Sequence, residues 1–234
     1  MKKEYDLIVS LGENCMVANN LRYRLMRPFS LPFDRVYMEN ERTLRYLIEG
    51  FKDRFSRLLL KDNIEKIKGS DEHKIVYKDN YSGYCFPNHF ENEILTDNEY
   101  KKVHDTLRRR IDRLFNSLEN SYSILFILAG ELSFNEEDIL EFKKTLLKLY
   151  PAKDITIRVM IFNYKDNEEN VIDNNISIYK YIRPMNLYDF TKTNYEWSFL
   201  DDIKLSNVNY KKNSIKLFSL KIKDKKYRLD LSWY

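Results

Sequence analysis

The sequence predicts an α/β fold in which helices flank a largely parallel central sheet, and three observations predict it. Two apolar runs, residues 5–12 (YDLIVSLG) and 122–130 (YSILFILAG), have the length and composition of buried strands, and each ends at a glycine. An amphipathic segment follows the second run, and two more strand-like runs come after it, at residues 154–163 and 176–183. This order of strand, helix and strand is typical of parallel α/β proteins.

The first strand-like run leads directly into a predicted helix. Gly12 ends the run, and Asn14 has the side chain of a helix N-cap. Apolar residues spaced by one helical turn give this helix one buried face, and Pro28 ends it. The next segment, residues 27–35 (RPFSLPFDR), is predicted to be a turn-rich loop with aromatic side chains.

The remaining elements follow from the same patterns. Helices are predicted over residues 41–51, 97–118 and 133–150, and short strands around a turn over residues 73–79 and 81–90. The alternating segment 213–234 predicts a C-terminal β-hairpin that turns at KDKK. With five glycines, five prolines and no repeat, the chain has no obvious linker, so we expect a single domain over residues 1–234.

Composition and motifs argue against several classes of protein. The 40 basic and 36 acidic residues leave a net charge of +4, which is too weak to indicate a nucleic-acid partner. The apolar runs are too short to span a membrane, and the N-terminus lacks an apolar segment of signal-peptide length. We therefore expect a soluble cytoplasmic protein whose two cysteines stay free. The sequence has no P-loop, G-x-G-x-x-G, C-x-x-C or H-E-x-x-H motif, so we expect no cofactor and no metal.

Cys15 is a candidate nucleophile because of its position. Ligands of open α/β sheets bind at the carboxyl ends of strands, and the elbow SLGENC follows such an end. With Asn14 as the cap, Cys15 lies in the first helical turn, where free N–H groups and the helix dipole favour a thiolate. The same N–H groups, beside Gly12 at the elbow, could also bind an oxyanion. The alternative is that Cys15 is a small buried core residue.

A nucleophilic cysteine needs a base, and the chain has three histidines. His89 follows a short strand in an aromatic surround, which makes it the best candidate, with a structural histidine as the alternative. His73 lies among charges and His104 on a helix, so both are expected to face solvent. Asp34 is our first choice to orient the base, because the preceding Pro32 and Phe33 would fix it. The substrate, whether small molecule, peptide or glycan, is not specified by these residues.

The segment SLGENCMVANNLRYRLMRPFSLPFDRV, residues 10–36, resembles the opening of a family described as papain-like cysteine peptidases. That opening is a strand, S-L-G-x-N-C, a helix with A and L-R, and S-x-P-F-D-W. The matching residues are Ser10, Leu11, Gly12, Asn14, Cys15, Ala18, Leu21, Arg22, Ser30, Pro32, Phe33 and Asp34. Arg35 stands where the family has tryptophan, a change that would alter the pocket wall. Weaker similarities follow at NHF, LRRRIDRL and ILFI, so the resemblance extends to about residue 130.

The resemblance implies that Cys15 is the nucleophile and His89 the general base of an acyl-transfer enzyme. It also implies a papain-like core, in which a helix packs on an antiparallel sheet. The strand pattern indicates otherwise, because a buried strand directly precedes the cysteine helix. We therefore expect a Rossmann-like or esterase-like sandwich, in which a strand-to-helix elbow also presents a nucleophile.

Two other functions remain open. Arg109 and Arg113 lie four residues apart on one face of a predicted helix, and arginines so placed can bind phosphate or carboxylate. They would suit a transferase or binding protein for an anionic sugar or nucleotide, with Cys15 only structural. The third hypothesis is an interaction module whose exposed aromatic loop, RPFSLPFDRVY, is the contact surface.

Overall fold

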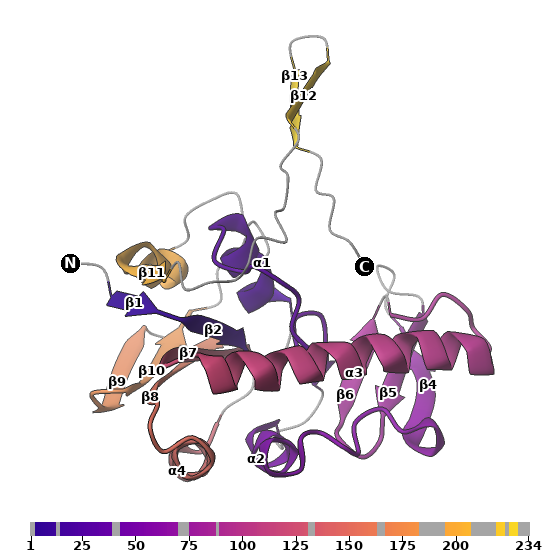
Figure 1. The fold of residues 1–234 in the computed structure, drawn as a ribbon, viewed down its shortest axis with the longest axis horizontal. Coiled ribbons are helices and arrows are strands. Elements are labelled where there is room, and N and C mark those ends of the chain that lie inside the picture. The colour runs from indigo at the N-terminus through magenta and orange to yellow at the C-terminus, as the bar shows by residue number, and fades with distance from the viewer. Residues whose placement is uncertain are drawn as a thin grey trace.

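The fold is mixed α/β, with a mostly parallel five-stranded sheet at its centre (Figure 1). The computed structural model describes residues 3–12, 15–38, 43–69, 75–87, 89–130, 134–162, 167–182, 195–206, 219–222 and 225–228. In sheet order, the strands are β2 (Leu7–Ser10), β7 (Ser123–Gly130), β8 (Asp154–Phe162), β10 (Ile176–Tyr181) and β9 (Glu168–Asp173). The first four are parallel, and β9 is antiparallel to β10 at the edge. The predicted parallel sheet is confirmed.

Helices cover both faces of this sheet. On one face, a single apolar core contains side chains from α2 (Thr43–Asp53), α3 (Asp97–Asn120) and α4 (Glu136–Leu149). On the other, a second core joins the sheet to α1 (Met16–Tyr23) and the 3-10 helix η2 (Tyr195–Asp202). The alternation of strand side chains explains the two cores: Leu7 and Val9 point into the first, and Ile8 into the second. In Figure 1, α1 lies above the sheet, and α2 and α4 lie below it.

A second sheet of four antiparallel strands packs into the first core. Its order is β3 (Tyr37–Met38), β6 (Tyr84–Pro87), β5 (Ile75–Asp79) and β4 (Ile64–Lys68), and the short 3-10 helix η1 (Lys61–Asn63) precedes β4. The predicted pair of strands around a turn is confirmed as β5 and β6. Tyr77, Tyr84 and Phe86 of this sheet share their core with α3 and the central sheet. The hydrophobic contacts are therefore continuous between the two sheets.

The helices begin where their capping residues lie. The Thr96 side chain accepts a hydrogen bond from the Glu99 N–H at the start of α3, and Asn135 caps α4 in the same way. The predicted helices over 97–118 and 133–150 are confirmed, with ends that differ by a few residues. The helix predicted from residue 41 is described from Thr43 as α2.

The start of α1 differs from the prediction. Cys15 occupies the N-cap position, and no side-chain hydrogen bond caps this helix among the residues described there. The predicted cap, Asn14, lies outside the described residues. Cys15 therefore precedes the first helical turn instead of lying within it.

Two smaller strand pairs complete the described structure. Strands β1 (Lys3–Tyr5) and β11 (Ile203–Leu205) pair in parallel. This pairing brings two segments that are about 200 residues apart in the sequence side by side. The strands β12 (Ser219–Ile222) and β13 (Lys225–Arg228) pair antiparallel. Much of the segment 213–234 lies outside the described residues, so the C-terminal hairpin stays a prediction, as does the single domain.

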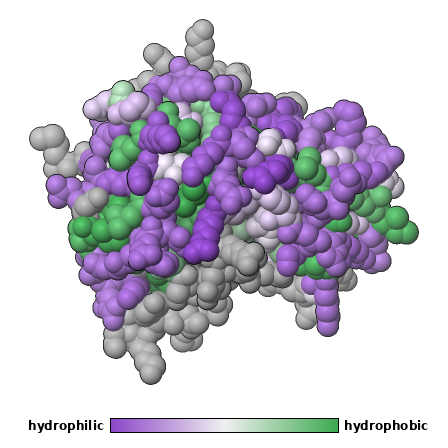
Figure 2. All heavy atoms as spheres, turned by 90° about the horizontal axis from the view of Figure 1, so that it is seen from below, coloured by the Kyte–Doolittle hydropathy of each residue, from purple (hydrophilic) through white to green (hydrophobic). Residues whose placement is uncertain are grey.

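The face seen from below carries its apolar side chains in separate patches between polar ones (Figure 2). Exposed apolar residues on α4, such as Leu140 and Leu147, are single side chains of the kind that most folded proteins expose. No helix in the described ranges has both the length and the apolarity needed to cross a membrane.

Candidate functional site

The elbow after β2 is held against two other segments by Gly12. This glycine has φ of +92°, in the region that L-residues rarely adopt. A Cβ atom on Gly12 would lie 3.5 Å from Cβ of Phe33 and 3.6 Å from Cε1 of Tyr84. The Phe33 and Tyr84 rings stack on each other with centroids 5.3 Å apart. The elbow that carries Cys15 thus meets both the loop before β3 and strand β6.

Cys15 is partly exposed at the start of α1, and its carbonyl accepts the Asn19 N–H at 2.9 Å. Burial raises the pKa of its thiol above the ordinary value. Three influences oppose this effect: its own backbone N–H, the Arg35 guanidinium and a hydrogen bond with the Asn19 side chain. Because burial outweighs them, the thiol is protonated at neutral pH. The expected thiolate at the helix start is therefore not the form that this structure favours.

His89 lies just beyond β6 and is neutral at pH 7. Burial lowers its pKa to about 4, helped by the positive charges of Arg110 and Arg35 and opposed by the hydrogen bond with Pro87. Nδ1 lies 2.9 Å from the Pro87 carbonyl oxygen, and the ring packs edge-on to Phe86. A carbonyl can only accept, so Nδ1 carries the proton and donates it to this bond. Nε2 is then left with a free lone pair, as a general base requires.

Arg35 links the surroundings of Cys15 and His89. Arg35 lies two residues before Tyr37, which pairs with Cys85 of β6, and His89 lies two residues beyond the end of this strand at Pro87. The Arg35 charge acts on both the Cys15 thiol and the His89 imidazole. The thiol and the imidazole, both of them described, are not hydrogen-bonded to each other.

Asp34 is buried in the loop before β3. Its Oδ2 atom accepts hydrogen bonds of 2.8 Å from Nη1 of Arg27 and from the Leu31 N–H. Burial raises the pKa of this carboxyl, and attraction to Arg27 and Arg110 opposes the rise. Oδ1 is buried and has no hydrogen-bond partner among the described residues. In this arrangement the Pro87 carbonyl orients the imidazole, and an orienting role for Asp34 stays a prediction.

The two arginines selected from the sequence have local partners. Arg109 is exposed and donates to Thr106 Oγ1 at 3.1 Å. Arg113 donates to the Ser30 carbonyl at 2.9 Å and lies over the Phe29 ring. Their role in anion binding stays a prediction.

Arg110 lies on the same helix, three residues before Arg113, but is not one of the two arginines selected from the sequence. Its charge acts on both Asp34 and His89, and its side chain is partly buried. The signal was present in the sequence, because Arg110 follows Leu107 by three residues and precedes Leu114 by four. Both leucines are buried, so Arg110 borders the buried face of α3.

The described residues contain no group of three or more histidine, cysteine or acidic side chains that could hold a metal ion. The predicted absence of metals and cofactors stays a prediction.

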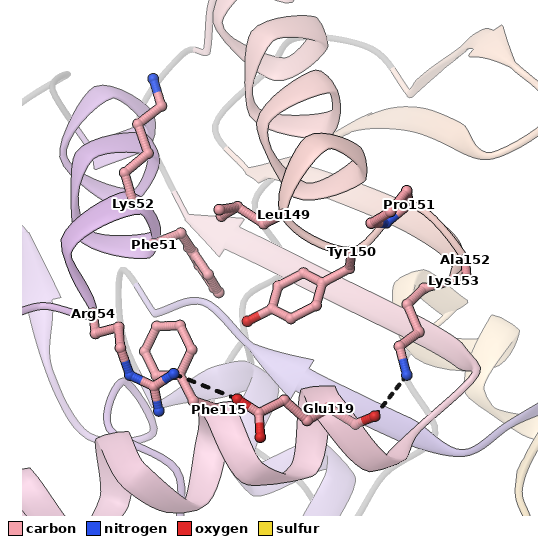
Figure 3. Close-up of a pocket in the computed structure, with 10 residues that line it drawn as sticks. All are labelled: Phe51, Lys52, Arg54, Phe115, Glu119, Leu149, Tyr150, Pro151, Ala152 and Lys153. Atoms are coloured by element: carbon pink, nitrogen blue, oxygen red, sulfur yellow. Dashed lines mark hydrogen bonds and ion pairs between the residues drawn. The ribbon is translucent and has the colours of Figure 1, made fainter.

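A separate surface hollow of about 540 Å³ lies between α2, α3 and the end of α4 (Figure 3). Its lining is Phe51, Lys52, Arg54, Phe115, Glu119, Leu149, Tyr150, Pro151, Ala152 and Lys153. Arg54 pairs with the Glu119 carboxylate at 3.4 Å, and Lys153 donates to the Glu119 carbonyl at 2.7 Å. Two of its basic side chains are thus held by Glu119, and its lining includes neither Cys15 nor His89.

Fold and site together define an α/β protein with a cysteine at a strand-to-helix elbow and a neutral histidine in the same electrostatic environment. The chain belongs to the family described as "Putative papain-like cysteine peptidase (DUF1796)", which matches residues 6–167. This match runs from the residue before β2 to the segment after β8, and it confirms the resemblance seen in the sequence. Neither a curated protein nor a solved structure matches the chain.

Proposed function

We propose that the protein is a cysteine-dependent acyl-transfer enzyme, a peptidase-like hydrolase, with Cys15 as nucleophile and His89 as general base. One observation carries the proposal: the charge of Arg35 acts on both the Cys15 thiol and the His89 imidazole, whose bond from Nδ1 to Pro87 leaves Nε2 as the basic nitrogen. Membership of a family described as cysteine peptidases supports the same chemistry.

The protonation states favour proton transfer during attack over a preformed ion pair. As Sγ of Cys15 bonds to the acyl carbon, Nε2 of His89 takes the thiol proton. The imidazolium then protonates the leaving group as its bond to the acyl carbon breaks. Water attacks the acyl-enzyme, giving up a proton to His89, and the thiol is released. Backbone N–H groups at the start of α1 would stabilise the oxyanion, and the Arg35 charge would stabilise developing thiolate.

Sγ and Nε2 must come within hydrogen-bond reach for this transfer. Catalytic hydrogen bonds are often long before substrate binds, and they shorten in the complex. Cys15 and His89 are each partly exposed, as access by a substrate requires.

For the finer architecture we propose an esterase-like or Rossmann-like sandwich in one domain. Helices on both faces of a mostly parallel sheet support it, as does the placement of Cys15 directly beyond strand β2. A papain-like core, in which a helix packs on an antiparallel sheet, accounts less well for the parallel pairing of the central strands.

The alternative function is the binding or transfer of an anionic sugar or nucleotide, with Cys15 structural. Positive charge near the site favours it, although Arg35 and Arg110 contribute that charge rather than Arg109. The third hypothesis, an interaction module with an exposed aromatic contact loop, has less support because the Phe33 side chain of this loop is only 1% exposed.

The test is the acylation and alkylation of Cys15. A neutral activated ester, p-nitrophenyl acetate, should place an acetyl group on Cys15, detected by mass spectrometry, and turnover should vanish in Cys15→Ala. In His89→Ala, the iodoacetamide rate at pH 7 should fall at least about tenfold, since general-base catalysis contributes roughly 10²–10⁴.

The alkylation rate of Cys15 should depend on pH differently in the wild type and in His89→Ala. The pKa of His89 lies near 4, so the base is available throughout pH 6–8 and the wild-type rate should vary little there. In His89→Ala the rate should follow the raised pKa of the thiol and climb only at alkaline pH.

The matched control is His104→Ala, because His104 lies on α3 and packs against Tyr100 instead. This variant should react like the wild type. Equal rates in His89→Ala and wild type, or no acetylation of Cys15, would remove the basis for the proposal.

A further inference from the structure

We infer that Arg35 and Arg110 form an anion-binding subsite beside Cys15, so that the acyl substrate carries a carboxylate or phosphate next to the bond that is cleaved. This inference rests on the proposed function of Cys15 and His89, and it names the charge of the substrate of that site.

Arg35 supplies the exposed side of the subsite. It is solvent-exposed, directly follows the buried Asp34, and lies two residues before Tyr37, which pairs with Cys85 of β6. The elbow packs on Phe33, two residues before Arg35. Arg35 therefore belongs to the loop that packs against the Cys15 elbow, and its side chain is exposed to solvent.

Arg110 supplies the partly buried side. Three residues further along α3, Arg113 donates to the Ser30 carbonyl and so holds the loop before β3 against the helix. The carboxylate of Asp34 in this loop is bonded to Arg27 and the Leu31 N–H, and its other oxygen has no described partner. Asp34 therefore attracts Arg110 through its charge alone, and the N–H donors of Arg110 are not bonded to Asp34.

Among the described residues, positive charge exceeds negative charge around Arg110. The charges of Arg35, Arg27 and Arg113 all act on Arg110, and Asp34 is the acid that offsets them there. Neither Arg35 nor Arg110 donates a hydrogen bond to any described side chain or carbonyl. Guanidinium groups with unused donors bind carboxylate and phosphate in a bidentate manner, and this strengthens where solvent is partly excluded.

A bound anion would also make His89 a stronger base. The charges of Arg110 and Arg35 help to keep the pKa of His89 low. Neutralising them with a substrate anion raises the basicity of Nε2 at the moment when the thiol proton must be removed.

The experiment compares two alkylating reagents of similar size, iodoacetate (an anion) and iodoacetamide (neutral), on Cys15 in the full chain. Cys85 is fully buried, and mass spectrometry separates the two sites. The ratio of the iodoacetate rate to the iodoacetamide rate should exceed that of glutathione by about tenfold, as electrostatic attraction allows. It should fall by about that factor in Arg35→Gln and in Arg110→Gln. Because both reagents report on the same thiol, changes in its pKa cancel in the ratio.

The matched control is Arg109→Gln, which removes the same charge from the neighbouring residue of α3 and should leave the ratio unchanged. Protection of Cys15 from iodoacetamide by inorganic phosphate or by acetate, at constant ionic strength, distinguishes a phosphate subsite from a carboxylate subsite.

A ratio equal to that of glutathione, or one insensitive to Arg35→Gln and Arg110→Gln, would overturn the inference while leaving the hydrolase proposal intact if p-nitrophenyl acetate still acetylates Cys15. An elevated ratio without acetylation would keep the subsite and remove the hydrolase. Absence of labelling by either reagent before unfolding would overturn both.

Discussion

Gly12 holds the backbone that leads to Cys15 in a conformation with φ of +92°. Left-handed backbone costs an L-residue roughly 1–2 kcal/mol, because its Cβ crowds the following carbonyl. The neighbours are less of an obstacle, because an added Cβ would meet Phe33 and Tyr84 at 3.5–3.6 Å, which is ordinary contact.

We therefore expect Gly12→Ala to lower the free energy of unfolding by about 1–2 kcal/mol, measured by urea denaturation. We also expect slower alkylation of Cys15, because the elbow must shift to relieve the strain. Unchanged stability together with unchanged reactivity would mean that the elbow does not depend on this conformation. The control is Ala18→Gly in α1, which should lower stability but leave the φ angle at position 12 unaffected.

Single residues also show how far the site could be predicted from sequence. Cys15 and His89 were selected because an elbow and a post-strand position are visible in the chain itself. The Pro87 carbonyl as the partner of His89 was not, since a backbone acceptor leaves no mark in the side-chain pattern. Arg35 and Arg110 are 75 positions apart in the sequence. Only the packing of the loop before β3 on α3 brings their charges together.

At the scale of elements, Asp6 connects the β1–β11 pair to the five-stranded central sheet. It lies between β1 and β2, and its carboxylate accepts hydrogen bonds from the Tyr122 and Ser123 N–H groups at the start of β7. The Ser206 hydroxyl, just beyond β11, donates to its other oxygen at 2.6 Å. Burial alone would raise the pKa of Asp6, but these hydrogen bonds and the charge of Lys153 outweigh it and lower the pKa.

We expect Asp6→Asn to lower the free energy of unfolding by about 1.5–3 kcal/mol at pH 7, the range for hydrogen bonds to a charged group. A lowered folded pKa means that the stabilisation is present above the unfolded pKa of about 3.9, and it is lost as pH falls through the folded value. The difference between variant and wild type, measured by urea denaturation, should therefore shrink towards pH 2.

The control for Asp6 is Glu4→Gln. Glu4 is an exposed acid of β1 that pairs with Lys204 at 3.7 Å, and surface pairs of this kind contribute little. A loss of stability in Asp6→Asn that stays the same from pH 7 to pH 2 would contradict a role for the charged carboxylate.

Elements could be predicted where burial leaves a pattern. The runs that became β2, β7, β8 and β10 are apolar because both of their faces are covered. Strand β9 (EENVID) was missed because it is an edge strand with few buried side chains. Strand β4 (IEKIK) was missed for the same reason, since it too lies at the edge of its sheet.

At the scale of the whole molecule, one aromatic side chain connects the layers. Phe51 of α2 packs its ring against Phe115 of α3, Phe126 of β7 and Phe142 of α4, with centroids 5.6–5.9 Å apart. Phe55 joins the same cluster and contacts Phe33 of the loop beside the site. The cluster thus extends from the helical layer to the wall of the Cys15 elbow.

Because the core is shared, we expect both sheets to unfold in one transition. The probe for the central sheet is fluorescence of Trp197, which is 1% exposed, in a background carrying Trp233→Phe. The probe for the antiparallel sheet is the reactivity of Cys85, which is 0% exposed, in a background carrying Cys15→Ser. In urea, the two probes should give the same midpoint, as two-state unfolding of one domain requires.

Phe51→Ala should then lower the free energy of unfolding by about 3–5 kcal/mol, the usual cost of removing a buried phenylalanine, and should shift both probes equally. Leu140→Ala is the control, since Leu140 is 44% exposed on α4 and its loss should change stability by less than about 0.5 kcal/mol. If Phe51→Ala moved the Trp197 transition and left the Cys85 transition in place, the two sheets would be independent units and the single domain would be wrong. The Cys15 elbow, which rests on Phe33 and Tyr84, would then lie at a boundary between domains rather than within one.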